Sequence, residues 1–389
     1  MVRELIIFIY LLLFKIAFNF FKVFPLQIKT VCVASFGDNI DYTTAALKTL
    51  SDEEIIVLQE PSCHYPFNTN TSQVIPFTIG KPFSFLKSIY HLATATTILV
   101  DNYFAFLSVT KFREDSTCIQ LWHAAGAIKK FGLQQPSTND RGSISRKRFV
   151  KVYNRFDYTI VGSETMAAIF QKSFGLPDSR IKRTGIPRSD FFFKSTETDN
   201  VLKKLLHRYP IIKQKKVILY APTFRLQELN EFQLAIDIEQ LYNSLSTDYV
   251  LFLKLHPAVT SNLTILYKNF LYDVSDYYDI NHLLLCTDLL ITDYSSIPFE
   301  FSLLERPMIF YAYDKEAYEG ENGLISNYQN RMPGQVVSTT EEIIEIIKSN
   351  NYETDRIRAF SEEWNLYSKG HSSLNVARLI IDSRSVDTA

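Results

Sequence analysis

The hydrophobic positions of this chain fall into short apolar runs that are separated by longer amphipathic stretches. Such runs predict buried β-strands at residues 30–34, 54–58, 97–100, 118–121, 158–161, 216–220, 249–255, 289–292 and 308–311. Helical spacing between them, as at 83–92 and 163–174, predicts connecting helices. Alternating strands and helices are typical of a parallel sheet covered on both faces, so the pattern predicts an α/β fold.

Two similar α/β halves are expected. The chain has 389 residues, 46% of them apolar, which is enough for two domains. The polar stretch 193–215 is the best candidate for a linker. We therefore expect a first domain at 26–194 and a second at 195–389, both Rossmann-like, with residues 1–25 as a separate segment. The 30 Phe and 22 Tyr exclude a disordered chain.

The N-terminal segment is the most apolar part of the chain. Residues 5–24 have nearly the length that spans a bilayer, but Lys15 and Lys22 interrupt them, and the longest unbroken apolar run is only Leu5–Phe14. No small-residue cleavage site follows. These features favour a basic, aromatic helix lying in the membrane interface, and they leave a spanning helix and a core or oligomer helix open.

The net charge of −1 hides an uneven distribution. Residues 1–194 carry 23 basic and 15 acidic side chains, a balance of +8, and residues 195–389 carry 18 and 27, a balance of −9. A membrane and acceptor patch is expected at the basic residues Lys15, Lys22, Arg141, Arg146, Lys147, Arg148 and Lys151. A solvated helix face is the alternative for the second part of this patch, and no nucleic-acid partner is expected.

Several common chemistries lose support from the sequence. The four cysteines are widely scattered, which argues against a disulfide framework or a structural zinc site. The chain has no G-x-G-x-x-G, Walker A, H-E-x-x-H or D-x-D sequence, so dinucleotide, ATP and zinc chemistry are disfavoured. No cofactor is predicted, and magnesium bound through a substrate phosphate stays open.

Polar residues collect where the predicted strands end. In open α/β sheets ligands bind beyond the carboxyl ends of the strands. The residues that follow these strands are His123, Pro222, Thr223, Arg225, Lys254, His256, Asp293, Ser295 and Ser296. They are expected to meet at one edge of the fold.

The segment around Asp293 is the strongest single signal. Ser295 and Ser296 lie where a strand gives way to a predicted helix at 297–304, and hydroxyls at a helix N-terminus can hold an anion. Glu300, one turn further on, could accept hydrogen bonds from a ribose. The alternatives are an ordinary helix cap and a solvated acid.

Two histidines and one arginine add acid–base and phosphate chemistry. A neutral imidazole at His123 or His256 can take a proton from an attacking hydroxyl, and a protonated one can stabilise a phosphate oxygen. Arg188, in the turn at 185–190, has the fork of donors that suits phosphate.

Six ordered motifs resemble a known family. They are CIQLWHAAGAIKKFGL (118–133), VGSETMA (161–167), TGIPRSD (184–190), ILYAPTFR (218–225), FLKLHPA (252–258) and LLITDYSSIPFEFSLLERPMIFYAYD (289–314). Together they resemble the CDP-glycerol glycerophosphotransferases of Gram-positive wall teichoic acid synthesis, from about residue 30 to the C-terminus. Most members carry Trp-His-Gly-Thr-Pro where this chain has Trp122-His123-Ala124-Ala125-Gly126, and this departure and the short length look like the primase branch.

The resemblance implies a GT-B fold, in which two Rossmann-like halves face a cleft, the first half against the membrane and the second holding the nucleotide. It implies that His123 is the catalytic base and that His256 contacts phosphate. The substrate-binding positions that it implies are Ala124, Ala125, Gly126, Ala127, Arg188, Pro222, Thr223, Lys254, Leu255, Asp293, Ser295, Ser296 and Glu300.

The implied reaction transfers glycerol phosphate from CDP-glycerol to the N-acetylmannosamine of an undecaprenyl-diphosphate disaccharide, with release of CMP. It implies a peripheral protein on the cytoplasmic face of the cell membrane, and membership of a teichoic acid synthesis complex stays open. A polymerase that extends the chain or uses CDP-ribitol, a nucleotide-sugar glycosyltransferase and a non-enzymatic phosphate-binding module remain as alternatives. Oligomeric state is not predicted.

Overall fold

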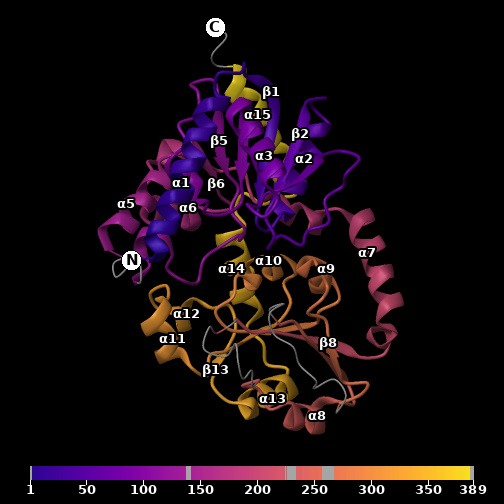
Figure 1. The fold of residues 1–389 in the computed structure, drawn as a ribbon. Coiled ribbons are helices and arrows are strands. Elements are labelled where there is room, and N and C mark those ends of the chain that lie inside the picture. The colour runs from indigo at the N-terminus through magenta and orange to yellow at the C-terminus, as the bar shows by residue number, and fades with distance from the viewer. Residues whose placement is uncertain (1, 137–141, 224, 226–233, 256–266, 386–389) are drawn as a thin grey trace. The chain divides into compact units, whose positions relative to one another are not determined.

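A computed structural model describes residues 2–136, 142–223, 225, 234–255 and 267–385. The chain divides into two compact units (Figure 1). Unit 1 contains Met1–Ala125, Phe131–Asp190 and Leu366–Ala389, and unit 2 contains Gly126–Lys130 and Phe191–Asn365. Each unit is built on one parallel sheet.

The sheet of unit 1 has seven strands in the order β3-β2-β1-β4-β5-β6-β7. Its strands are β1 (Gln27–Ala34), β2 (Glu54–Gln59), β3 (Gln73–Pro76), β4 (Ala95–Val100), β5 (Thr117–Gln120), β6 (Tyr158–Ile160) and β7 (Ile181–Lys182). All neighbours are parallel, and Val31 of β1 is in register with Ile56 of β2 and Ile98 of β4. The strand order reverses between β1 and β4, which is where such sheets bind ligands.

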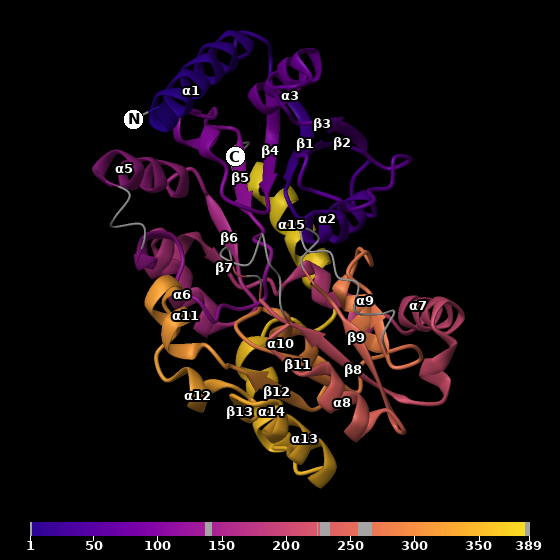
Figure 2. The same ribbon diagram turned by 60° about the horizontal axis from the view of Figure 1, so that its bottom comes forward.

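Helices cover both faces of this sheet. They are α1 (Val2–Phe21), α2 (Asp38–Lys48), α3 (Pro82–Thr94), α5 (Gly142–Tyr153), α6 (Glu164–Phe174) and the C-terminal α15 (Ser372–Ser385), with short 3-10 turns such as η1 (Ala105–Ser108). Figure 2 shows α15 in yellow beside α2 and the strands of unit 1. Val376 and Ile380 of α15 are fully buried in the same cluster as Cys32 and Leu99 of the central strands.

The sheet of unit 2 has six strands in the order β10-β9-β8-β11-β12-β13. Its strands are β8 (Lys216–Ala221), β9 (Tyr249–Leu253), β10 (Leu271–Asp273), β11 (Leu289–Thr292), β12 (Met308–Tyr311) and β13 (Val336–Val337). The described helices of this unit are α7 (Ser195–Arg208), α8 (Ile238–Leu245), α9 (Ile280–Leu285), α10 (Ile297–Phe301), α11 (Lys315–Asn322), α12 (Tyr328–Arg331), α13 (Thr340–Ser349) and α14 (Thr354–Trp364). The order reverses between β8 and β11, as it does between β1 and β4.

The predicted α/β class and the two Rossmann-like sheets are confirmed. The boundaries of the units differ from the expected 26–194 and 195–389, because α15 packs on the first sheet and residues 126–130 group with unit 2. The expected linker at 193–215 is mostly the helix α7. Val201 and Leu205, one turn apart, bury a face of that helix, which its polar composition conceals.

The apolar N-terminal segment is the helix α1, and it packs along the outside of unit 1 (Figure 1). Leu11, Phe14 and Phe18 form its buried face. The ring of Phe14 stacks on Phe106 at 4.8 Å between centroids and meets the edge of Phe85 on α3 at 6.0 Å. By length and composition, residues 3–21 could also cross a membrane.

Candidate functional site

The polar residues of unit 1 gather at the carboxyl ends of β1, β4 and β5, beside the reversal of strand order. Asp101, which follows β4, is fully buried. Its carboxylate accepts hydrogen bonds from the backbone N–H groups of Ser35, Phe36 and Gly37, each at 2.9 Å. Burial raises the pKa of Asp101 to about 7, although these three donors oppose the shift. The carboxylate therefore ties the loop after β1 to the end of β4.

His123 lies beside this carboxylate with its ring fixed. Its Nδ1 lies 3.1 Å from the carbonyl oxygen of Asp101, and its ring stacks on Phe36 at 4.0 Å between centroids. A carbonyl oxygen can only accept, so Nδ1 carries the proton and Nε2 keeps its lone pair. Burial and the nearby Arg188 guanidinium lower the pKa of His123 to about 4. The ring is therefore a neutral base at physiological pH.

The residue before the histidine has a strained backbone. Trp122 has a φ of 59°, in the left-handed region that non-glycine residues seldom adopt. Its indole stacks on Phe131 and meets the edges of Phe170 and Phe174, and its carbonyl accepts a hydrogen bond from Asn39 at 3.0 Å. Packing and this bond hold the turn that presents His123.

Arg188 joins the same group from the turn after β7. Its backbone N–H donates to Asn39 Oδ1 at 3.0 Å, and its Nη1 pairs with Asp38 Oδ2 at 2.6 Å. The side chain is buried, and an arginine fork in a partly desolvated site is suited to a phosphate group. Unit 1 thus brings His123 and Arg188 together around Asn39.

Unit 2 has a second polar group at the reversal between β8 and β11. Asp293, buried after β11, accepts from the backbone N–H of Thr223 at 2.8 Å and pairs with Arg225 at 2.7 Å. Arg225 also makes a bidentate contact to Asp314, with both distances 3.0 Å. Thr223 Oγ1 is buried and has no hydrogen-bond partner in the described part of the chain. Asp293 therefore positions the loop that carries Thr223 rather than pointing at a ligand itself.

The serines lie at the start of α10. Ser295 Oγ is 2.8 Å from Thr292 Oγ1 and accepts a weak hydrogen bond from the backbone N–H of Ile297. Ser296 is the N-cap residue and makes no side-chain cap. Glu300 is buried in the same helix. The helix ends at Phe301 and continues as a 3-10 turn to Leu304, so the predicted helix at 297–304 changes type midway.

The expected substrate-binding residues 124–127 are small and buried. Ala124, Ala125 and Ala127 are buried. Gly126 lies against α10, and a Cβ added there would be 2.4 Å from the ring of Phe299. Only glycine allows this approach.

The remaining expected residues of unit 2 differ in their contacts. Pro222 is half-buried after β8. Lys254 donates to the carbonyl oxygens of Ser275 and Tyr277 at 2.9 and 2.6 Å, and burial lowers its pKa. Leu255 is buried, and its N–H donates to Ser275 Oγ at 2.9 Å. His256 lies outside the described residues.

The expected membrane and acceptor patch divides into two parts. Lys15, Lys147, Arg148 and Lys151 line one groove between α1 and α5. Lys22 does not line that groove and donates to the carbonyl oxygen of Lys111 at 3.0 Å. Arg146 is exposed on α5, and Arg141 lies outside the described residues.

Sequence reasoning missed Asp38, Asn39 and Asp101. The rule about carboxyl ends of strands would have found them, because Asp101 directly follows β4 and Asp38 follows β1 after a short loop. Lys129 was missed as well, and its ammonium lies 5.5 Å from the ring centre of Tyr318. In the described ranges, no three His, Cys, Asp or Glu side chains are grouped to hold a metal ion.

Comparison with known proteins identifies the family. The chain is 42% identical over 301 residues to the teichoic acid glycerol-phosphate primase of Bacillus subtilis strain 168, covering 77% of each protein. It is 37% identical over 297 residues to the teichoic acid ribitol-phosphate primase of Bacillus spizizenii strain W23, covering 75% of this chain and 76% of that protein.

A solved structure of the wall teichoic acid polymerase TagF superposes with a TM-score of 0.79 at 23% identity, over 100% of both chains, and shows the same GT-B-like fold. Residues 16–382 match the family described as CDP-glycerol:poly(glycerophosphate) glycerophosphotransferase. The motifs that suggested this family from the sequence are therefore confirmed, and the chain belongs to the CDP-glycerol:poly(glycerophosphate) glycerophosphotransferases.

Proposed function

We propose that this protein is a teichoic acid glycerol-phosphate primase. It transfers glycerol phosphate from CDP-glycerol to the N-acetylmannosamine of an undecaprenyl-diphosphate-linked disaccharide. The observation that carries the chemistry is His123, a neutral imidazole whose Nδ1 is fixed on the Asp101 carbonyl and whose Nε2 keeps its lone pair. The primase from Bacillus subtilis supports the choice of reaction.

The reaction is a displacement at phosphorus. An acceptor hydroxyl attacks the phosphorus that carries glycerol, its proton passes to His123 Nε2, the bond to the bridging oxygen breaks, and CMP leaves. Arg188 offsets negative charge on the phosphates, and positioning with electrostatics supplies most of the rate. The Asp38 pair holds Arg188 in place until the donor arrives.

Unit 2 holds the donor in this proposal. The Thr223 hydroxyl, buried and without a partner in the described ranges, and the hydroxyls of Ser295 and Ser296 are donors suited to pyrophosphate oxygens. Glu300 accepts from the ribose, and Lys254 and His256 add positive charge. The ion pair between Asp293 and Arg225 and the hydrogen bond from Thr223 hold these loops in place. In this proposal, unit 1 therefore binds the acceptor and unit 2 binds the donor.

The membrane surface is the proposed location, on its cytoplasmic face. One face of α1 is packed on unit 1, and its other face leaves Leu5, Ile9 and Leu13 exposed. A helix docked along its length on a folded unit, with an apolar outer face, fits a helix that lies in the interface. Assembly with other enzymes of teichoic acid synthesis belongs to the same proposal.

A ribitol-phosphate primase is the second candidate, because the ribitol enzyme of Bacillus spizizenii is 37% identical over a similar length. The deciding experiment incubates the purified chain and a short-tailed lipid-diphosphate disaccharide with CDP-glycerol or CDP-ribitol, and follows CMP and product mass. One added glycerol phosphate supports the primase. Many added units identify a polymerase, and transfer only from CDP-ribitol identifies the other donor.

His123→Ala tests the assigned base. A general base contributes about 10²–10⁴-fold, so CMP release should fall by that factor. His64→Ala, at an exposed histidine of the same unit, is the matched control and should retain activity. Near-normal CMP release from His123→Ala would remove the histidine from this role.

A further inference from the structure

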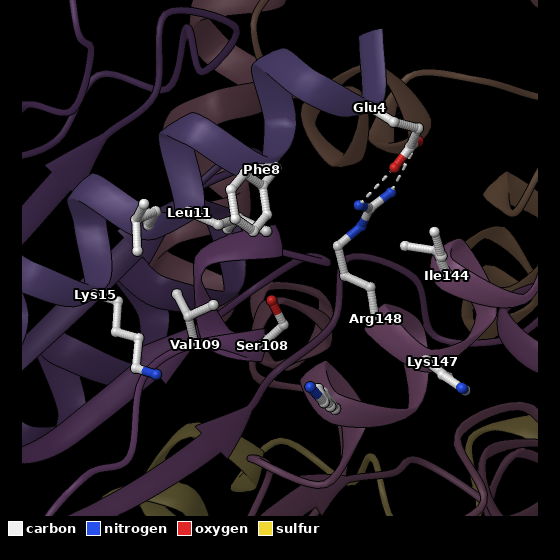
Figure 3. A pocket seen from close by; sticks show the side chains of 11 residues that line it. Glu4, Phe8, Leu11, Lys15, Ser108, Val109, Ile144, Lys147 and Arg148 are labelled. Carbon is white, nitrogen blue, oxygen red and sulfur yellow. Dashed lines mark hydrogen bonds and ion pairs between the residues drawn. The ribbon is translucent and has the colours of Figure 1, made fainter. Parts of the chain in front are cut away.

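An apolar groove with a basic rim lies between α1 and α5 in unit 1. It encloses about 560 Å³. Its apolar walls include Phe8, Leu11 and Leu12 of α1, Val109 after η1 and Ile144 of α5. Figure 3 shows Phe8, Leu11, Val109 and Ile144 around it, with Arg148 reaching across to Glu4. The groove is separate from the histidine site, and the proposed reaction has not used it.

The rim of the groove carries four cations from two helices: Lys15 of α1, and Lys147, Arg148 and Lys151 of α5. Arg148 pairs with Glu4 at 3.1 Å, and both its terminal nitrogens reach that carboxylate. No ion pair of the described chain involves the three lysines. Glu4 is therefore the one acidic residue among the described residues of the lining, against four cations, which leaves an excess of positive charge around the apolar groove.

The apolar wall continues onto the exposed face of α1. Leu12 is 44% exposed and Phe8 62%, and Ile9, Leu13 and Ile16 extend the same surface along the helix. Exposed apolar surface of this extent on one helix marks a contact with lipid or with another apolar chain. An occupant can thus place its charged end at the rim and its apolar chain along α1.

We propose that this groove binds the diphosphate and the first isoprenoid units of a polyprenyl diphosphate, the lipid end of the acceptor. The inference rests on the proposed function for its choice of lipid. A diphosphate carries charge on two adjacent phosphates, which suits cations spread over two helices better than a single phosphate does. Its arrival replaces Glu4 as the partner of Arg148.

The groove is also joined to the catalytic side of unit 1 by a short piece of chain. Asp101 holds His123, and seven residues later Ser108 and Val109 form part of the groove lining. Between them, the carbonyl of Asn102 accepts from Gln120 at 3.0 Å, and Tyr103 packs on Phe149 of α5 at 4.8 Å between ring centroids. A lipid held in the groove would therefore contact the same anchored segment, residues 101–109, that holds His123 at its other end.

The test is direct binding of farnesyl diphosphate, a soluble short polyprenyl diphosphate, to the full chain, measured by calorimetry without CDP-glycerol. Leu12→Trp fills the groove and should weaken binding at least tenfold. Leu13→Trp is the matched control, because the neighbouring residue is 61% exposed and does not line the groove. Lys147→Ala with Lys151→Ala should also weaken binding at least tenfold, and Lys172→Ala on α6 should not.

Inorganic diphosphate represents the charged part of the ligand, and farnesol represents its isoprenoid part. Each should bind at least tenfold more weakly than farnesyl diphosphate. The groove assignment is overturned if farnesyl diphosphate binds no better than inorganic diphosphate, or if the two tryptophan variants bind it equally. Transfer to a soluble disaccharide acceptor without lipid is measured separately. Binding without any transfer would count against the proposed function alone, and transfer without binding would count against the groove alone.

Discussion

At the scale of single residues, the protonation of His123 depends on its surroundings. Burial and Arg188 lower its pKa to about 4. Replacing Arg188 by glutamine removes a cation and leaves the Asp38 carboxylate unneutralised, and both changes favour the protonated ring. We expect the pKa of His123 to rise in Arg188→Gln, as measured by NMR titration of the histidine ring.

Arg183→Gln is the control for that titration, because Arg183 pairs with Glu164 and Asp178 on the exposed surface. Its His123 titration should match the unmodified protein. The assigned electrostatics would fail if Arg188→Gln left the ring pKa unchanged or lowered it.

A substitution at Gly126 tests how closely the backbone there approaches α10. Gly126→Ala places a methyl group 2.4 Å from the Phe299 ring, which must move. Overpacking of this kind costs about 1–3 kcal/mol, so the free energy of unfolding should fall by that amount in urea titrations. Gly320→Ala in α11 meets nothing within 4 Å and should be neutral or stabilising. Equal effects of the two changes would refute the contact.

At the scale of elements, one carboxylate holds α15 to the turn that carries Arg188. Asp190 accepts from the backbone N–H groups of Ser372 and Ser373 at 2.9 and 2.7 Å, both at the start of the helix. Asp190→Ala leaves two buried donors without a partner, which should cost about 1.5–3 kcal/mol of unfolding free energy. Asp382→Ala, at an exposed acid of the same helix, should change thermal and urea stability little.

The elements that the sequence predicted best are those whose burial is complete. β11 and β12 begin and end at the predicted residues, because all four positions of each are buried and all but Thr292 are hydrophobic. α7 was taken for a linker, because only Val201 and Leu205 of its fourteen residues are buried. The placement of α15 on the first sheet depends on contacts nearly two hundred residues apart, which no local pattern contains.

Residues of the candidate site also divide into those that a local sequence pattern predicts and those that depend on long-range contacts. Motif residues after the strands, such as His123 and Asp293, were identified from the sequence. Their supporting partners Asp101 and Asn39 were not, although both follow strands, because their roles are hydrogen bonds to backbone groups of distant loops. Such partners are chosen by three-dimensional proximity, and residue type alone does not distinguish them from surface acids and amides.

At the scale of the whole molecule, buried histidines set the response to acid. Burial lowers the pKa values of His91, His123 and His282 to about 4, below the ordinary value near 6.5. Between these values the unfolded chain binds more protons, so stability is lost as pH falls from about 6.5 to 4. Burial also raises the pKa of Asp101, to about 7, and the pKa values of Glu60 and Asp157, and these carboxyls act in the opposite direction.

The three histidines outweigh these carboxyls, because their shifts are larger than those of Glu60 and Asp157. We expect the free energy of unfolding to be about 1–3 kcal/mol lower at pH 5 than at pH 7, by urea titration at constant ionic strength. His91→Gln removes one of the three groups and should make the dependence on pH shallower. Equal or greater stability at pH 5 would contradict the assigned burial of these rings.

The return of α15 to unit 1 has a consequence for how the protein is made. A ribosome releases the residues of α15 only after all of unit 2 has emerged. Until then the first sheet lacks the cover that Val376 and Ile380 provide over Cys32 and Leu99. The first sheet therefore has an open apolar face throughout the synthesis of unit 2, and its folding is completed only after α15 has emerged.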